Sequence, residues 1–264
     1  MAQMEMGETR AKARWTRFAA LGLLMAALGP LLMFVAGLLW GLDLSEDAGF
    51  FLVTAAIGLV GAFLVARFGT WSKFAGILAA LALLAALFWT AFSLGQPASF
   101  FDFVPGILVV PGVLIAIICC IAAIVAARRG HVSTSAEGGE QRGIRIVLTA
   151  IVVLAVISGV LTFVSRTTAD EADADFVISL KDFEFDATDY QLEPGTTVLV
   201  RNDDPFLHTF TIEELDIDET MTPGSEELIE IPDEPGDYIV FCRPHSDPEE
   251  PNPEDDMAAR LTIE

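Results

Sequence analysis

Five long runs of this chain contain no charged residue, and each is at least 19 residues long. The runs are Phe18–Leu42, Ala48–Ala66, Phe74–Phe101, Phe103–Ala127 and Ile146–Ser165. A helix needs about 20 apolar residues to cross the roughly 30 Å of hydrocarbon in a bilayer. Buried helices of soluble proteins rarely reach this length five times without a charge. The sequence therefore predicts an α-helical membrane bundle of five transmembrane helices over residues 18–165.

The first run has one competing interpretation, a cleaved signal peptide, because basic residues precede it. Its 25 apolar residues exceed the usual length of a signal-peptide core, which is about 7 to 15 residues. No small-residue cleavage motif leads from this run into a soluble domain. We therefore expect the first run to remain in the protein as a helix.

The basic residues of the first 165 positions all lie at the same ends of these runs. They are Arg10, Lys12, Arg14, Arg17, Arg67, Lys73, Arg128, Arg129, Arg142 and Arg145. The alternate connections, around 43–47 and 95–103, hold no Lys or Arg. The positive-inside rule then places residues 1–17 in the cytoplasm. Five crossings would make the chain a multi-pass protein of the plasma membrane, with its C-terminal part outside the cell.

The charge changes abruptly near Arg166. Residues 1–165 hold eight acidic and ten basic residues, whereas residues 166–264 hold 29 acidic and five basic residues, a net charge of −24. Such a break marks a boundary between a membrane and an aqueous environment. We expect an acidic linker over 166–175 and an extracytoplasmic domain over 176–264.

This second region has the pattern of short strands. In DFVISLKDFEFD the apolar residues Phe176, Ile178 and Leu180 alternate with others, and similar runs follow between Pro, Gly, Asp and Asn. Those runs are EPGTTVLVRN, FLHTFTIEE, EELIEI, GDYIVFC and AARLTIE. About seven short strands in about 90 residues predict an all-β Greek-key sandwich.

Four residues with soft or imidazole ligand atoms fall at strand ends in this framework. His208 lies before or within a strand, Cys242 ends the strand DYIVFC, His245 follows three residues later, and Met257 precedes the last strand. Two imidazoles, one thiolate and a long, weak thioether bond are the ligands of a blue-copper site. The pattern predicts one copper ion.

Residues 175–264 resemble the cupredoxins, in particular the plastocyanin, amicyanin and halocyanin group. The segment KDFEFDATDYQLEPGTTVLVRNDDPFLHTF is similar to the family's opening strands and contains the first ligand histidine, here His208. YIVFCRPH is similar to its Cys-x-x-His hinge, and MAARLTIE to its closing strand. The resemblance implies a cupredoxin-like sandwich with one type 1 copper held by His208, Cys242, His245 and Met257.

The spacing before the methionine departs from the family. Eleven residues separate His245 from Met257, whereas the family usually has two to four. The segment SDPEEPNPEDD between them reads as a loop insertion, and closure entropy grows only slowly with loop length. Met257 keeps the distance in sequence that the family has between its methionine ligand and the final strand, and Met221 does not. We therefore expect Met257 to be the axial ligand of the copper. Water, a carbonyl or no ligand are the alternatives.

Three other interpretations of the ligands were open. A cysteine in an external domain is normally in a disulfide, but Cys242 has no second cysteine on its side of the membrane. Zinc takes the same Cys and His ligands and is the main rival metal. A domain that has lost its metal is the third interpretation. Cys119 and Cys120, in the fourth apolar run, are expected to be packing residues.

The copper enzymes are disfavoured by residues around the cysteine. A trinuclear oxidase site needs flanking histidines, whereas Phe241 and Arg243 flank Cys242, and a binuclear purple site needs two hinge cysteines. We therefore expect that the protein is not an enzyme and that it is a membrane-anchored carrier of single electrons. Copper acquisition or delivery without redox turnover is the alternative, and a structural module beside active helices is a third hypothesis.

The expected partner is a redox protein, such as a basic cytochrome or a respiratory complex. We expect no binding to nucleic acid. The acidity of the second region has two explanations, adaptation to saline surroundings or steering of a cationic partner. The acidic residues are spread from Asp170 to Glu264, which favours adaptation.

Overall fold

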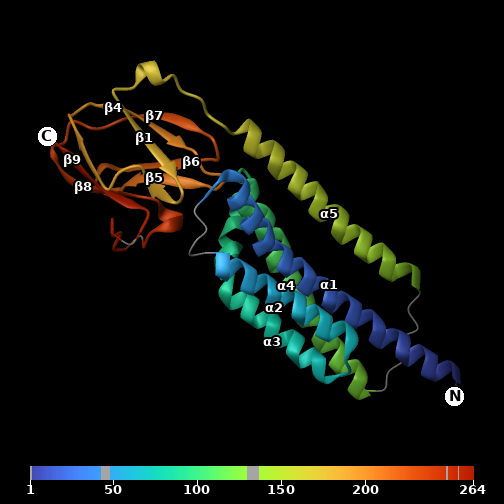
Figure 1. The fold of residues 1–264 in the computed structure, drawn as a ribbon. Helices are drawn as coiled ribbons and strands as arrows, with labels where there is room; N and C mark the ends of the chain where they lie inside the picture. Colours follow the sequence, from blue (N-terminus) through green and yellow to red (C-terminus); the bar gives the residue numbers. More distant parts are fainter. Residues whose placement is uncertain (1, 43–47, 130–136, 248, 255) are drawn as a thin grey trace. The chain divides into compact units, whose positions relative to one another are not determined.

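The computed structural model describes residues 2–42, 48–129, 137–247, 249–254 and 256–264 (Figure 1). The chain separates into two compact units, one of Met1–Pro97 with Phe101–Ile157 and one of Ala98–Phe100 with Ser158–Glu264. The connections 43–47 and 130–136, which contribute to the expected orientation, lie outside the described residues.

The apolar runs form helices. The helical elements are α1 (Ala2–Trp40), α2 (Ala48–Arg67), α3 (Trp71–Ala86), the 3-10 helix η1 (Phe88–Gly95), α4 (Phe100–Arg129) and α5 (Glu137–Val164). Among the described residues, four helices are by themselves long and apolar enough to cross a membrane. They contain Arg14–Trp40, Ala48–Arg67, Phe100–Arg128 and Arg142–Val164.

The third apolar run is broken rather than continuous. We expected one helix over Phe74–Phe101, but α3 ends at Ala86 and η1 continues at an angle of 60° to it. The hydroxyl of the buried Thr90 donates to the carbonyl of Leu87 at 2.7 Å, which satisfies a backbone acceptor at this break. The region thus has four candidate spans, or five if the bent pair is one span.

Small residues bring helices α1 and α4 into backbone contact. A Cβ atom at Gly22 would lie 2.5 Å from the carbonyl oxygen of Gly112, and one at Gly112 would lie 2.6 Å from that of Gly22. Side chains cannot occupy this space, so only glycine permits the crossing. Close approach through small residues is the usual way in which membrane helices pack.

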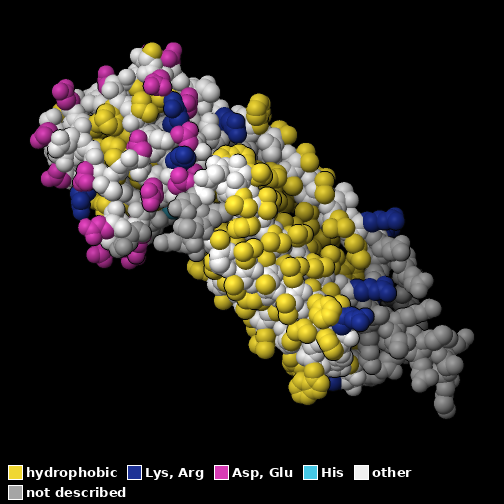
Figure 2. Space-filling view, in the orientation of Figure 1, with side chains coloured by type: hydrophobic (Ala, Val, Ile, Leu, Met, Phe, Trp, Pro, Cys, Tyr) yellow, Lys and Arg dark blue, Asp and Glu magenta, His cyan; other side chains and the backbone are white. Residues whose placement is uncertain are grey.

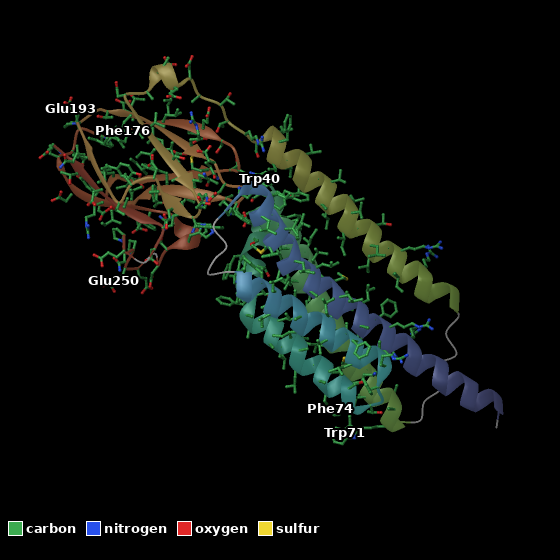
Figure 3. The ribbon with its side chains drawn as sticks, in the orientation of Figure 1. Trp40, Trp71, Phe74, Phe176, Glu193 and Glu250 are labelled. Carbon is green, nitrogen blue, oxygen red and sulfur yellow. The ribbon has the colours of Figure 1, made fainter. Side chains whose placement is uncertain are left out.

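Aromatic residues lie at the ends of the apolar helices. Figure 3 labels Trp40 at the end of α1 and Trp71 and Phe74 at the start of α3. Trp40 is 46% exposed and Trp71 is 85% exposed. Tryptophan prefers the boundary between lipid and water, so these positions fit the ends of membrane spans.

The second unit is a β-sandwich. Its strands are β1 (Phe176–Lys181), β2 (Glu184–Phe185), β3 (Asp189–Leu192), β4 (Thr197–Asn202), β5 (His208–Ile212), β6 (Ile217–Met221), β7 (Glu226–Glu230), β8 (Gly236–Phe241) and β9 (Ala258–Ile263). The strand orders are β2-β1-β4-β7 in one sheet and β3-β9-β8-β5-β6 in the other. Strands β1 and β4 pair in parallel, as do β3 and β9, so each sheet joins segments that are distant in sequence. The predicted sandwich is confirmed, with nine strands instead of about seven.

The core between the sheets is built from residues that alternate along the strands and point inward. Ile178 and Leu180 of β1 are fully buried, whereas Phe176 is 37% exposed. The core also includes Phe210, Cys242 and other residues from both sheets. Because Cys242 belongs to this core, the strands that bury the apolar residues also fix the thiol.

Candidate metal centre

The two histidines and the cysteine come together at one end of the sandwich. His208 is the first residue of β5, Cys242 follows β8, and His245 ends the short 3-10 helix η4 (Arg243–His245). Within the described residues, their ligand atoms form a cluster in which all lie within 4.8 Å of one another. The structure therefore brings together three of the four predicted ligands through atoms suited to a metal.

The hinge that carries Cys242 is held by hydrogen bonds from neighbouring backbone. The N–H of His245 donates to the carbonyl of Cys242 at 3.0 Å, which forms the tight turn. The N–H of Thr209 donates to Cys242 Sγ at 3.4 Å, and the hydroxyl of Thr209 accepts the N–H of Arg243 at 2.9 Å. Strand β5 thus supplies His208 and also fixes the hinge.

The three ligand atoms converge on one point. Nδ1 of His208 lies 3.6 Å from Cys242 Sγ, Nδ1 of His245 lies 3.3 Å from it, and the two Nδ1 atoms are 3.1 Å apart. His208 and Cys242 are fully buried, and His245 is partly exposed. Two imidazole nitrogens and one sulfur in a dry site are a donor set that suits copper. The residues present therefore fit a copper ion.

Met257 is attached to the same hinge through its backbone. Its carbonyl accepts the N–H of Cys242 at 2.9 Å and the hydroxyl of Ser246 at 2.7 Å, and its N–H donates to the carbonyl of His245 at 3.3 Å. Its side chain is 3% exposed and belongs to the core cluster that contains Cys242. The eleven-residue insertion therefore does not carry Met257 away from the hinge.

The insertion closes on itself. Asp256 Oδ2 accepts the N–H of Asn252 at 3.0 Å, and the N–H of Asp256 donates to the carbonyl of Asn252 at 2.8 Å. Glu250, labelled in Figure 3, lies on this acidic loop. Since Ser246 bonds to Met257, the two ends of the loop meet directly before strand β9.

Met221 lies nearer to the cluster than we expected. It is directly opposite His208 in the antiparallel pair of β5 and β6, and it is fully buried. Opposed residues of an antiparallel pair share one face of the sheet. Met221 is therefore a second buried thioether in the same core. Within the described residues, its backbone forms none of the hydrogen bonds that join Met257 to the hinge.

A buried carboxylate supports His208 from behind. Nε2 of His208 lies 2.8 Å from Oδ2 of Asp204, and both side chains are fully buried. Burial alone would lower the pKa of His208, but the hydrogen bond to Asp204 and the nearby Cys242 raise this pKa to about 9. Burial would raise the pKa of Asp204, but its hydrogen bonds hold that pKa below the usual range. Asp204 is therefore a charged carboxylate at neutral pH.

His245 has a different environment. Burial and the charge of His208 lower the pKa of His245 to about 3, so its ring is neutral at neutral pH and one ring nitrogen is free to bind a metal. Phe183 packs edge-on against both rings, with centroids 4.9 Å from His245 and 5.7 Å from His208. This phenyl ring covers part of both imidazole rings.

The sequence interpretation missed Asp204, Phe183 and Thr209. Asp204 stands four residues before His208, with three apolar residues between them, and that spacing is a signal that could have found it. Phe183 lies in a turn with a positive φ of 61°, which is rare outside glycine and has no signature in the sequence. Thr209 acts through its backbone N–H, which any residue except proline provides, and through its hydroxyl, which accepts the N–H of Arg243.

One family profile matches the chain over the end of α5 and most of the sandwich. A sequence profile described as "Cupredoxin-like domain" matches residues 154–250. Among curated proteins, none matches the chain significantly.

Solved structures that are similar to part of the chain include a purple cupredoxin from Nitrosopumilus maritimus, at 16% identity and a TM-score of 0.26, covering 34% of this chain and all of that one. An oxidised amicyanin mutant has 18% identity and a TM-score of 0.30, covering 38% of this chain and 90% of that one. A copper-containing nitrite reductase from Thermus scotoductus has 16% identity and a TM-score of 0.28, covering 38% of this chain and 26% of that one.

The sandwich, the profile match and the convergent His208, Cys242 and His245 all agree with the predicted fold class. Such a domain binds copper and belongs to an electron-transfer type of protein. The chain therefore consists of a helical region with four to five candidate apolar spans followed by a cupredoxin-like copper domain.

Proposed function

We propose that this protein is a membrane-anchored blue copper carrier of single electrons at the outer face of a prokaryotic plasma membrane. The observation that carries the proposal is the convergence of one thiol and two imidazoles within 4.8 Å inside the sandwich. A bound copper ion supplies a one-electron couple between Cu(II) and Cu(I). The protein supplies the ligands and a largely buried site that holds them in place.

In this proposal His208, Cys242 and His245 are the equatorial ligands of one type 1 copper, and Met257 is the axial ligand. Soft thiolate and thioether sulfur favours copper over harder ions. The buried His208 and Cys242 belong to the sandwich framework, whereas the partly exposed His245 lies nearest to solvent. His245 is therefore the ligand through which an electron would pass to or from a partner protein.

The proposed anchoring rests on the helices. Residues 1–17 would be cytoplasmic, 18–165 would cross the membrane, 166–175 would be a linker and 176–264 would be the extracytoplasmic domain. The number of crossings decides the side, because five crossings separate the termini and four do not. The bent pair α3 and η1 is thus the element on which sidedness depends. Alkaline phosphatase fused after Glu264 should be active outside the cell, and an inactive fusion would contradict the orientation.

The proposed partner is a redox protein, such as a basic cytochrome or a respiratory complex. Figure 2 shows acidic side chains over the visible surface of the sandwich, with few basic ones among them. Charge steering weakens as salt shortens the screening length from about 10 Å at 0.1 M to about 3 Å at 1 M. A rate of electron transfer that falls steeply over this range supports steering, and a flat rate supports saline adaptation alone.

Electron exchange with a basic cytochrome tests the function. The full-length protein in detergent, loaded with copper and reduced, is mixed with an excess of oxidised cytochrome c. We expect one cytochrome to be reduced per chain, with one electron leaving the copper, and no reduction by the Cys242→Ser variant. A loaded protein that passes copper to an acceptor but exchanges no electron would instead support the delivery function.

A further inference from the structure

The buried carboxylate of Asp204 has no role in the proposed ligand set, yet it lies directly behind one of the ligands. Its Oδ2 atom is 2.8 Å from Nε2 of His208, and neither side chain is exposed to solvent. A carboxylate can only accept, so Nε2 of His208 carries the proton. Nδ1, which faces Cys242 Sγ, is therefore the ring nitrogen on the side where a metal would bind.

A second set of contacts fixes the carboxylate itself. The N–H of Asp182 donates to Asp204 Oδ1 at 2.9 Å, and the N–H of Phe183 donates to Oδ2 at 3.1 Å. These two residues join β1 to β2 and have positive φ angles of 58° and 61°. Consecutive N–H groups in this conformation point to one side and form an anion-binding concavity. The turn therefore holds the negative charge of Asp204 in place.

The loop that carries Asp204 is also fully bonded. Asn202 Oδ1 accepts the N–H of Asp204 at 2.9 Å, and its amide group donates to the carbonyls of Phe206 and Met221 at 2.8 Å each. Asn202 is buried as well. Because the loop cannot shift without breaking these bonds, Asp204 keeps its position when the metal changes its charge.

We propose that Asp204 is the positioning residue of the copper centre, which fixes the His208 ring with Nδ1 toward Cys242 and adds a buried negative charge that favours Cu(II) over Cu(I). The inference rests on the proposed function as a copper carrier. A carboxylate that accepts the second N–H of a ligand histidine orients the ring and raises its basicity. Both effects stabilise the more highly charged ion, and they lower the reduction potential of the centre.

The test compares Asp204→Asn with Asp203→Asn in the full-length protein. The asparagine has the size of aspartate and its oxygen can still accept from His208, but the buried charge is lost. Asp203 directly precedes Asp204, its side chain is exposed, and its carboxylate accepts a hydrogen bond from the hydroxyl of Ser179. Asp203→Asn therefore removes an equal charge outside the buried site. Redox titration of the visible absorption band gives the potential of each variant.

We expect the ratio of Cu(II) to Cu(I) affinity to fall by at least tenfold in Asp204→Asn, which equals a rise of about 59 mV for a one-electron couple. Asp203→Asn should leave the potential near that of the wild type. If both potentials are unchanged while Asp204→Asn still binds copper and is coloured, the inference is wrong and the function proposal stands. If the wild type binds copper without a thiolate band, the function proposal fails instead.

A second measurement decides the case in which Asp204→Asn does not fold. The chain has three histidines, so 15N-histidine labelling of the wild-type protein in the Cu(I) state gives few ring signals. We expect one ligand histidine with a slowly exchanging proton on Nε2 and none on Nδ1, assigned to His208 by its loss in His208→Gln. A proton on Nδ1 of His208, with a bare Nε2, would overturn the inference.

Discussion

The helical region and the sandwich differ in the partners of their buried polar side chains. In the described part of the helical region, the buried Lys73 donates to the carbonyl of Val65 at 2.6 Å and to that of Phe68 at 3.3 Å, at the end of α2. Its charge satisfies backbone acceptors that the helix end leaves without partners. In the sandwich, the buried Asp204 and His208 bond to each other, and Nδ1 of His208 faces Cys242 Sγ.

The two regions also differ in how they pack. The helices meet through residues without side chains, as at Gly22 and Gly112, whereas the sandwich encloses large residues such as Phe210 and Leu261. Close helix contacts give stability in lipid without a cavity. A sandwich core has depth, and its end can hold a ligand cluster. The comparison teaches that the candidate metal ligands of the described residues lie in the sandwich, while the helices carry the apolar surface of candidate membrane spans.

The largest effect that tests this division is the loss of copper from the sandwich. Cys242→Ser removes the thiolate, so we predict a colourless protein with strongly weakened copper binding. The double variant Cys119→Ser and Cys120→Ser removes the cysteines of the helical region and should keep both colour and stoichiometry. Metal analysis and visible spectra check this. Colour that survives Cys242→Ser but disappears in the double variant would place the metal among the helices.

The copper-free sandwich should lose stability at alkaline pH. The folded-state pKa of His208, raised to about 9, exceeds its unfolded value of about 6.5. Its contribution to stability is therefore complete below pH 6.5 and disappears as the pH rises through about 9. At about 1.4 kcal/mol per pKa unit, we predict a loss of about 3 kcal/mol between pH 6 and pH 10. Denaturant unfolding of the copper-free protein measures it, and Asp204→Asn should show a much flatter profile.

A substitution in the helical region should leave the copper unaffected. Gly22→Val places side-chain atoms against the backbone of α4, where overpacking typically destabilises by about 1 to 3 kcal/mol. Gly49 has open space around its Cβ position, so Gly49→Val is the matched control. We expect Gly22→Val to lower the melting temperature in detergent while the copper spectrum stays the same. A changed spectrum would show that the two regions are coupled.

The smallest predicted effect concerns the two buried methionines. If Met257 is axial, Met257→Leu should keep copper and raise the reduction potential by on the order of 59 mV, a tenfold change in oxidation-state preference. Met221→Leu changes the same side chain in the same core cluster and should have no such effect. A shift in Met221→Leu alone would assign the axial position to β6 instead of the start of β9.

Much of the fold was predictable because each region has a local signature. Uncharged runs such as Phe18–Leu42 predict spans directly, and alternation in the strand of Ile178 and Leu180 predicts a sheet face. The break after Ala86 was not predicted, since an apolar run carries no charge pattern at the point where it bends. The nine strands exceeded the expected number because β3 and β6 carry little strand pattern: β3 has only four residues, and the middle of β6 is the polar stretch Asp-Glu-Thr.

The site was predictable where the ligands have fixed spacing. Cys242 and His245 share one hinge, and Met257 keeps its offset from β9, so the insertion did not hide it. Asp204 was missed because a carboxylate does not stand out among the 29 acidic residues after position 165. Its role depends on which side chain the loop buries, and that is a property of the folded chain.

X-ray absorption at the copper edge of the loaded full-length protein tests the central claim most directly. The spectrum counts the atoms bound to copper without reference to any variant. We predict one copper per chain with one short bond to sulfur and two to imidazole nitrogen, from Cys242, His208 and His245. A copper shell without sulfur, or one with two thiolates such as Cys119 and Cys120 would supply, would contradict the account.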